Sequence, residues 1–214
     1  MDNQIVHNFC ESRLNNNNPP EILNSYTSLF ITIIPLLYGM PKNNIFYNLA
    51  CMLIFNGFGS FYYHYKLNSL GKQADEMSMI LATYFGLCGL LKLNFLQDYK
   101  KINFYNTFNN IYMIIFLSLN TILQLDKLFP LLFGLYIFTT LFFIHKTYIK
   151  YKNNNELLHL CTYNYELTLS FIGASCWIIS EIYCNEYTKY GHVLWHILFP
   201  LGFYKLILKY DKIL

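Results

Sequence analysis

The chain has 214 residues, of which 55% are hydrophobic and only 13% charged, and its formal net charge is +3. Soluble domains usually carry about 25% charged residues, so this composition excludes an ordinary soluble domain and favours a polytopic membrane protein. The 20 tyrosines and 19 phenylalanines suit lipid contact and the aromatic belts of membrane interfaces. Because the net charge is small and dispersed, we expect membrane lipids but no nucleic acid among the partners.

The first two dozen residues are polar, and no cleavable signal pattern is found in them. The first apolar segment is therefore expected to act as an uncleaved anchor. We assign residues 1–24 to an N-terminal arm and residues 25–214 to one membrane domain.

Seven apolar segments approach the length of about 20 residues that a helix needs to cross a bilayer. They cover residues 25–41, 45–65, 75–93, 108–125, 128–147, 165–184 and 192–210. Polar breaks separate them, among them residues 66–72 and residues 94–106. The fourth segment is the weakest because Asn120 and Gln124 interrupt it. The sequence therefore predicts an all-α, polytopic membrane protein with seven transmembrane helices.

The positive charges predict the orientation of this protein. With seven helices, ten of the 15 lysines and arginines fall on the face opposite the N-terminus. Positive charge accumulates on the cytosolic side of membrane proteins. We therefore expect a cytosolic C-terminus and a luminal N-terminus in an integral protein of the endoplasmic reticulum or the Golgi.

Two pairs of polar residues share a spacing that places them on one helical face. His192 and His196 lie four residues apart, close enough to bind one metal ion. Ser60 and His64 have the same spacing, and Asp75 begins another apolar run. By the helix count, the three segments meet at one membrane depth on the N-terminal face. Three imidazoles, a carboxylate and a hydroxyl are the groups that a hydrolytic zinc centre requires.

Each of these residues also has a structural interpretation. An intramembrane histidine can be a hydrogen-bonded packing residue. Ser60, next to Gly57 and Gly59, can be a small-residue contact between helices. Asp75 can be an ordinary acidic residue in the first turn of a helix, where the helix dipole favours it.

The order of these motifs resembles the alkaline ceramidase family. The residues that carry the resemblance are Gly59-Ser60-Phe61-Tyr62-Tyr63-His64, then Asp75-Glu76-Met77-Ser78-Met79-Ile80, and finally His192-Val193-Leu194-Trp195-His196. This family belongs to a superfamily of seven-helix membrane hydrolases, which includes the adiponectin and progestin receptors. The Asp-Glu-x-x-Met-Ile run and the tryptophan before the last histidine are typical of the ceramidase branch. The resemblance covers essentially the whole chain.

The arm resembles a region that forms a calcium site in this family. The resemblance places that site at Asn8, Phe9, Glu11 and Glu21. However, Asn8 stands where the family has a carboxylate, and Arg13 stands where it has an asparagine. Calcium needs several oxygen ligands and net negative charge, so we expect a degraded site. In the alternative interpretation, Glu11 and Glu21 belong to a solvated polar arm.

Cys10 and Cys184 occupy cysteine positions of the family. The topology predicts both on the non-cytosolic face, where disulfides persist. The resemblance implies a disulfide that fixes the arm beside the predicted helix 165–184, and two free thiols are the alternative. A usually acidic family position in that helix is Ser180 here, with Glu181 adjacent, which leaves substrate preference open.

The resemblance implies a zinc ion bound by His64, His192 and His196, which lowers the pKa of a bound water to about 7. Asp75 is expected to act as general base or acid, and Ser60 to donate a hydrogen bond to the water or the oxyanion. The implied substrate is ceramide or a related N-acyl lipid, cleaved to sphingosine and a fatty acid. Two alternatives stay open, namely a receptor-like or lipid-binding member with little or no catalysis and a non-enzymatic membrane scaffold.

Overall fold

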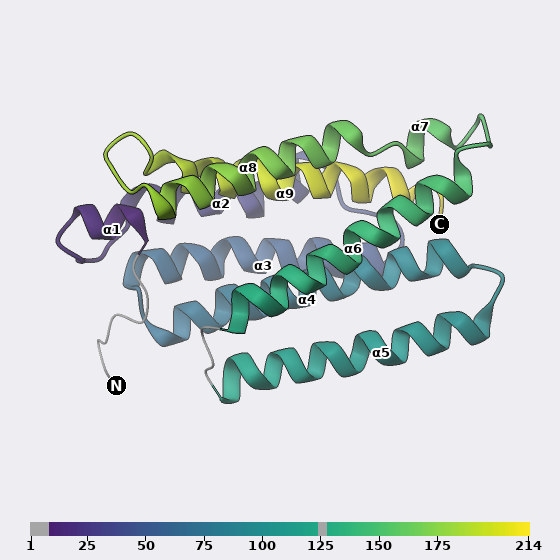
Figure 1. The fold of residues 1–214 in the computed structure, drawn as a ribbon, viewed down its shortest axis with the longest axis horizontal. Coiled ribbons are helices and arrows are strands. Elements are labelled where there is room, and N and C mark those ends of the chain that lie inside the picture. The colour runs from purple at the N-terminus through teal and green to yellow at the C-terminus, as the bar shows by residue number, and fades with distance from the viewer. Residues whose placement is uncertain (1–8, 124–127) are drawn as a thin grey trace. The chain divides into compact units, whose positions relative to one another are not determined.

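A computed structural model describes residues 9–123 and 128–214, and these residues are helical with short connections (Figure 1). The helices are α1 (Cys10–Leu14), α2 (Ile22–Tyr38), α3 (Asn44–Lys66), α4 (Ser69–Phe95), α5 (Tyr99–Leu117), a π-helical turn η1 (Ser118–Ile122), α6 (Phe129–Tyr151), α7 (Leu158–Cys161), α8 (Asn164–Ile182) and α9 (Tyr190–Asp211). Every predicted apolar segment coincides with part of a long helix, so the all-α class is confirmed.

Within the described residues, four helices are long and apolar enough to cross a bilayer. They are α3, α4, α6 and α9. Helix α2 is apolar but has only 17 residues. These helices support a membrane protein, whereas seven transmembrane helices stay a prediction.

The break predicted over residues 94–106 is wrong in extent, because α4 continues to Phe95 and α5 begins at Tyr99. The Asp98 side chain caps α5 by accepting a hydrogen bond from Lys101 N at 3.1 Å. Lysine and asparagine made this segment resemble a loop, but both residues tolerate a helical backbone where the side chain reaches solvent. The interruption predicted at Asn120 is found, since this buried residue lies in the π-helical turn. Gln124, the second predicted interruption, lies outside the described residues.

The break predicted over residues 66–72 is also shorter than expected. Leu67 turns the chain with a φ of 49°, and α4 begins at Ser69. Asp75 therefore lies in the second turn of the helix and not at its start. Because the helix dipole acts mainly within the first turn, it does not account for Asp75.

The chain divides into two compact units. The first comprises Met1–Met40, Leu53–Ser78 and Asn164–Lys205, and the second comprises Pro41–Met52, Met79–Tyr163 and Leu206–Leu214. All predicted site residues that the structure describes belong to the first unit. The boundary predicted at residue 24 stays a prediction.

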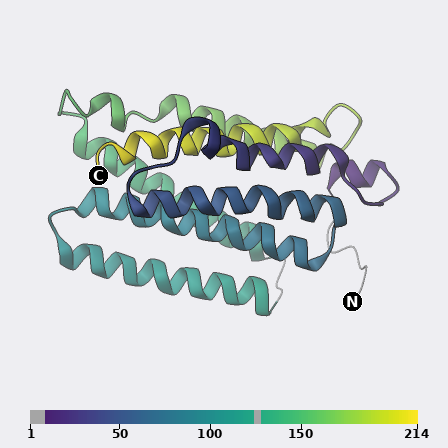
Figure 2. The same cartoon turned by 180° about the vertical axis from the view of Figure 1, so that it is seen from behind.

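Close helix contacts build the first unit. Helices α2 and α9 lie side by side in both views (Figures 1 and 2), and the Tyr204 hydroxyl donates to Gly39 O at 2.7 Å. A Cβ atom at Gly59 would lie within 3.1 Å of backbone atoms of Ala74 and Asp75. The absence of a side chain at Gly59 therefore lets α3 approach α4 next to Ser60 and Asp75.

Polar residues in the second unit form hydrogen bonds between helices. Asn94 Nδ2 donates to Thr147 Oγ1 at 2.8 Å, and the Tyr136 hydroxyl donates to Asn109 Oδ1. These bonds satisfy polar groups that would be costly in an apolar environment. We assign no chemistry to them.

Candidate metal centre

Three histidines from two helices converge in the first unit. His64 lies near the end of α3, and His192 and His196 lie one turn apart at the start of α9. One nitrogen from each ring lies within 4.8 Å of the others. Their exposed fractions are 1%, 3% and 2%, so all three imidazoles are withdrawn from solvent and point to a common place.

The second nitrogen of two of these rings already has a partner. His64 Nδ1 lies 2.6 Å from Glu21 Oε2, and His196 Nδ1 lies 3.1 Å from Thr27 Oγ1. Histidines that bind a metal almost always hold the other ring nitrogen in such a bond, which fixes the tautomer and the ring orientation. The Nε2 atoms of His64 and His196 thereby remain available to a metal ion.

The residues fit a zinc ion. Zinc takes imidazole nitrogens at about 2.0–2.1 Å in tetrahedral geometry, and catalytic sites commonly supply three protein ligands. The three nitrogens converge to within 4.8 Å of one another, and the oriented rings match the usual surroundings of such ligands. Within the described residues, no further histidine, cysteine or acidic side chain joins the cluster.

Glu21 connects this cluster to the arm. Its carboxylate is fully buried, and its Oε1 accepts hydrogen bonds from Phe9 N at 2.9 Å and from the Ser12 hydroxyl at 2.6 Å. Burial by itself raises the pKa of Glu21, but the hydrogen bond and charge of His64 and the Ser12 hydroxyl bring it down to about 2. An ionised Glu21 therefore holds His64 and the arm together.

Asp75 and Ser60 lie beside His64. The Asp75 carboxylate is hydrogen-bonded to the Ser60 side chain and interacts electrostatically with His64. Asn56 Nδ2 donates to Asp75 Oδ1 at 2.8 Å and to Asp75 O at 3.1 Å. Two polar residues of α3 thus orient the carboxylate next to the histidines.

The carboxylates of the implied calcium site have other partners. Glu11 accepts hydrogen bonds from Leu23 N at 2.8 Å and Asn24 N at 2.9 Å, so it satisfies free N–H groups at the start of α2. The fully buried Glu21 contradicts the interpretation of a solvated arm. Phe9 packs its ring against His64 and His192, with centroid distances of 4.9 and 4.6 Å. Asn8 lies outside the described residues.

Cys10 and Cys184 form a disulfide with a Cα–Cα distance of 5.3 Å. It joins α1 to the chain just after α8.

Ser180 is fully buried, whereas Glu181 faces the arm, where its Oε2 lies 2.8 Å from Arg13 Nη2. The acidic side chain at this end of α8 is therefore Glu181.

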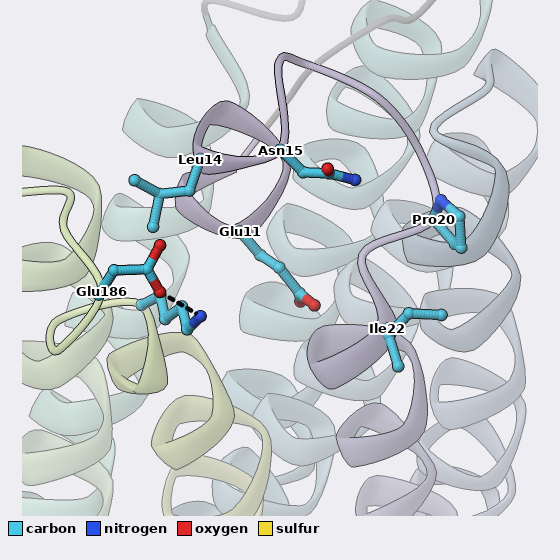
Figure 3. Close-up of a pocket in the computed structure, with 7 residues that line it drawn as sticks. Glu11, Leu14, Asn15, Pro20, Ile22 and Glu186 are labelled. Atoms are coloured by element: carbon cyan, nitrogen blue, oxygen red, sulfur yellow. Dashed lines mark hydrogen bonds and ion pairs between the residues drawn. The ribbon is translucent and has the colours of Figure 1, made fainter.

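A polar cavity of about 290 Å³ opens beside the arm. Figure 3 shows Glu11, Leu14 and Asn15 from the arm with Glu186 opposite them. Glu186 is ion-paired with Lys189 at 2.6 Å. The cavity lining contains none of the three histidines and neither Asp75 nor Ser60, so we do not assign the candidate chemistry to it.

These features define a helical membrane protein with a candidate metal centre, and comparison with known proteins identifies the family. Residues 5–213 match the Ceramidase family. The chain therefore belongs to the ceramidase family, which confirms the resemblance seen in its motifs. It is also similar to alkaline ceramidase 1 of Mus musculus, with 23% identity over 208 residues that cover 91% of this chain and 75% of the mouse protein.

The sequence did not reveal all residues around the centre. It indicated the three histidines, Asp75 and Ser60, but it gave no role to Thr27 or Asn56 and assigned Glu21 to calcium. A signal existed for Asn56, because Asn56, Ser60 and His64 follow one another at four-residue spacing along one helical face. No local pattern marks Thr27, which is 169 residues from its partner His196.

Proposed function

We propose that this protein is a zinc-dependent membrane amidase that hydrolyses ceramide, or a related N-acyl lipid, to sphingosine and a free fatty acid. Membership of the ceramidase family supports hydrolysis of the ceramide amide. The observation that carries the proposal is the cluster of three buried histidines with a hydrogen-bonded carboxylate and hydroxyl beside it.

In this proposal, the three histidines hold the metal ion through their Nε2 atoms, and Glu21 and Thr27 fix two of the rings. When bound, zinc supplies an acidified water molecule and polarises the substrate carbonyl. Hydrolysis forms a bond from the water oxygen to the carbonyl carbon and breaks the C–N bond. The departing nitrogen then needs a proton.

Asp75 is our candidate for the residue that moves this proton. Its carboxylate accepts hydrogen bonds from Asn56 and Ser60, which hold it in one orientation next to His64. It would take a proton from the water and deliver it to the departing amine. Ser60 has a single O–H group, so during the reaction it would turn this hydroxyl from Asp75 to the negative charge that develops on the carbonyl oxygen.

Product analysis tests the proposed function. The purified chain in lipid nanodiscs should convert ceramide into equal amounts of sphingosine and fatty acid, and the His64→Ala variant should not. Binding of ceramide without products would instead support a receptor-like member of the superfamily. Neither binding nor products would favour a membrane scaffold.

We also propose that the activity does not require calcium. The oxygens of Glu11 and Glu21 are occupied by N–H and O–H donors of the chain itself, and Arg13 adds a positive charge to the arm. An ion that needs several free oxygen ligands would gain little here. Turnover should therefore be unchanged when a calcium-selective chelator is added.

The measurement is turnover over a range of buffered free calcium concentrations, with zinc kept constant. Glu11→Gln serves as a matched variant, because it retains an oxygen acceptor for α2 but removes one charge from the implied site. A requirement for micromolar calcium that moves to higher calcium concentrations in Glu11→Gln would show that the arm does bind the ion.

We further propose a luminal N-terminus and a cytosolic C-terminus in the endoplasmic reticulum or the Golgi. The lysine and arginine asymmetry favours this orientation. His64, Asp75 and His192 would then lie towards the luminal side, together with the disulfide-linked arm. Oxidising conditions in the lumen suit that disulfide.

Glycosylation mapping in microsomes tests the orientation. The chain has no Asn-x-Ser/Thr acceptor of its own, so the background is clean. An acceptor inserted after Met1 should be modified, and an acceptor on an added C-terminal tag should not. The reverse result would invert the orientation and move the candidate centre to the cytosolic side.

A further inference from the structure

Glu181 lies between the arm and a candidate metal ligand. Arg13 Nη2 donates to Glu181 Oε2 at 2.8 Å and to its backbone oxygen at 3.0 Å. Cys10 N donates to Glu181 Oε1 at 3.3 Å. The same Oε1 lies 3.7 Å from His192 Nδ1. One carboxylate therefore faces two residues of the arm and one imidazole of the centre.

The three imidazoles differ at their second nitrogen. His64 has Glu21 and His196 has Thr27 as a hydrogen-bond partner. His192 Nδ1 is buried and has no hydrogen-bond partner among the described residues. A metal-binding imidazole that lacks such a partner is rare. Glu181 Oε1, at 3.7 Å from His192 Nδ1, lies just beyond hydrogen-bond distance of it.

We propose that Glu181 is the positioning residue of His192 and that Arg13 holds Glu181 in place, so that docking of the arm is coupled to zinc affinity. This inference rests on the proposed function, because it requires His192 to be a metal ligand. Arg13 binds Oε2 and leaves Oε1 turned towards His192 Nδ1. The arm thus acts on the centre in two ways, directly through its own Glu21 and indirectly through Arg13, which holds Glu181 of α8.

The disulfide supports this coupling. Cys10 and Cys184 are joined covalently, and Arg13 and Glu181 are joined by an ion pair. Cys10 and Arg13 lie three positions apart in α1 and therefore on one face of that helix. Glu181 lies in the last turn of α8, and Cys184 follows just after the helix ends. The disulfide keeps the arm in place, and the ion pair sets the direction of the Glu181 carboxylate.

The charge of Arg13, considered alone, would predict tighter zinc binding when this residue is neutralised. Loss of a positive charge near the centre would favour a cation there, whereas loss of the Glu181 orientation would weaken zinc binding. The Arg13 and Glu181 side chains are 37% and 21% exposed, so solvent screens the charge of the arginine. We therefore expect the loss of orientation to dominate.

Zinc affinity of the full chain in nanodiscs, measured by competition with a chelator of known affinity, tests this inference. Glu181→Gln should weaken zinc binding by about 10- to 100-fold, the usual effect of losing such a partner. Arg13→Gln should weaken it less, and the double variant should match Glu181→Gln alone, because Arg13 acts through Glu181. Glu186→Gln is the matched control, since it removes a carboxylate from another ion pair nearby, and its zinc affinity should equal that of wild type.

The outcomes separate this inference from the proposed function. Wild-type zinc affinity in Glu181→Gln, with affinity lost in His192→Ala, would overturn the inference and leave the proposed metal centre intact. A lower melting temperature in Glu181→Gln with unchanged zinc affinity would likewise reduce Glu181 to a structural role. Tighter zinc binding in Arg13→Gln would overturn the coupling through the arm. A wild-type chain that binds no zinc would overturn both proposals.

Discussion

Replacement of His196 by alanine should leave the protein without bound zinc and without ceramide hydrolysis. His196 is 2% exposed, and it is one of the three histidines whose ring nitrogens converge. Two remaining imidazoles provide too few ligands for a tetrahedral site, which usually needs at least three from the protein. The variant should also lose the hydrogen bond between Thr27 Oγ1 and His196 Nδ1.

Elemental analysis and turnover measured on one preparation check this expectation. His159→Ala is a suitable control, because His159 is exposed and belongs to the short helix α7 in the other unit. The control should retain wild-type zinc content and activity. If His196→Ala kept a full equivalent of zinc, the three histidines would not be the ligands.

Replacement of Asp75 by asparagine should retain zinc but lower turnover by a factor on the order of 10²–10⁴, the usual size of a general acid–base contribution. Asparagine preserves the shape of the side chain and an oxygen that can accept the hydrogen bond from Asn56. It cannot accept and deliver the proton. The loss should therefore fall on the rate and not on metal binding.

The neighbouring Glu76 provides the control for this variant. Its Oε1 lies 3.9 Å from Lys72 Nζ, and it contributes no group to the proposed centre. Glu76→Gln removes an equal charge one residue away and should keep turnover per zinc within a few-fold of wild type. The same mild effect in Asp75→Asn would make Asp75 a structural residue and defeat the proposed mechanism.

The sequence predicted the helices well because long apolar segments have few alternatives in a membrane. It predicted their ends poorly where polar residues continue the helix. Residues 96–98 replace the long loop expected over residues 94–106, and α4 begins before its apolar run. A polar side chain at a helix end reaches water in either conformation, so its polarity does not mark the boundary.

The histidines, Asp75 and Ser60 were predictable because four-residue spacing is a local property of a helix. The residues that orient them were not, since they come from elsewhere in the chain. Glu21 lies 43 residues from His64 in the sequence, and Arg13 of the arm lies 168 residues from its partner Glu181. Such contacts depend on tertiary packing, which leaves no periodic pattern in the sequence.

Dependence of turnover on zinc occupancy tests the central claim most directly. The purified wild-type chain should lose ceramide hydrolysis when a chelator removes its zinc, and activity should return in proportion to the zinc restored, up to one equivalent per chain. Proportional recovery is the result that this account predicts. Full turnover in a preparation with less than about a tenth of an equivalent of zinc would contradict it.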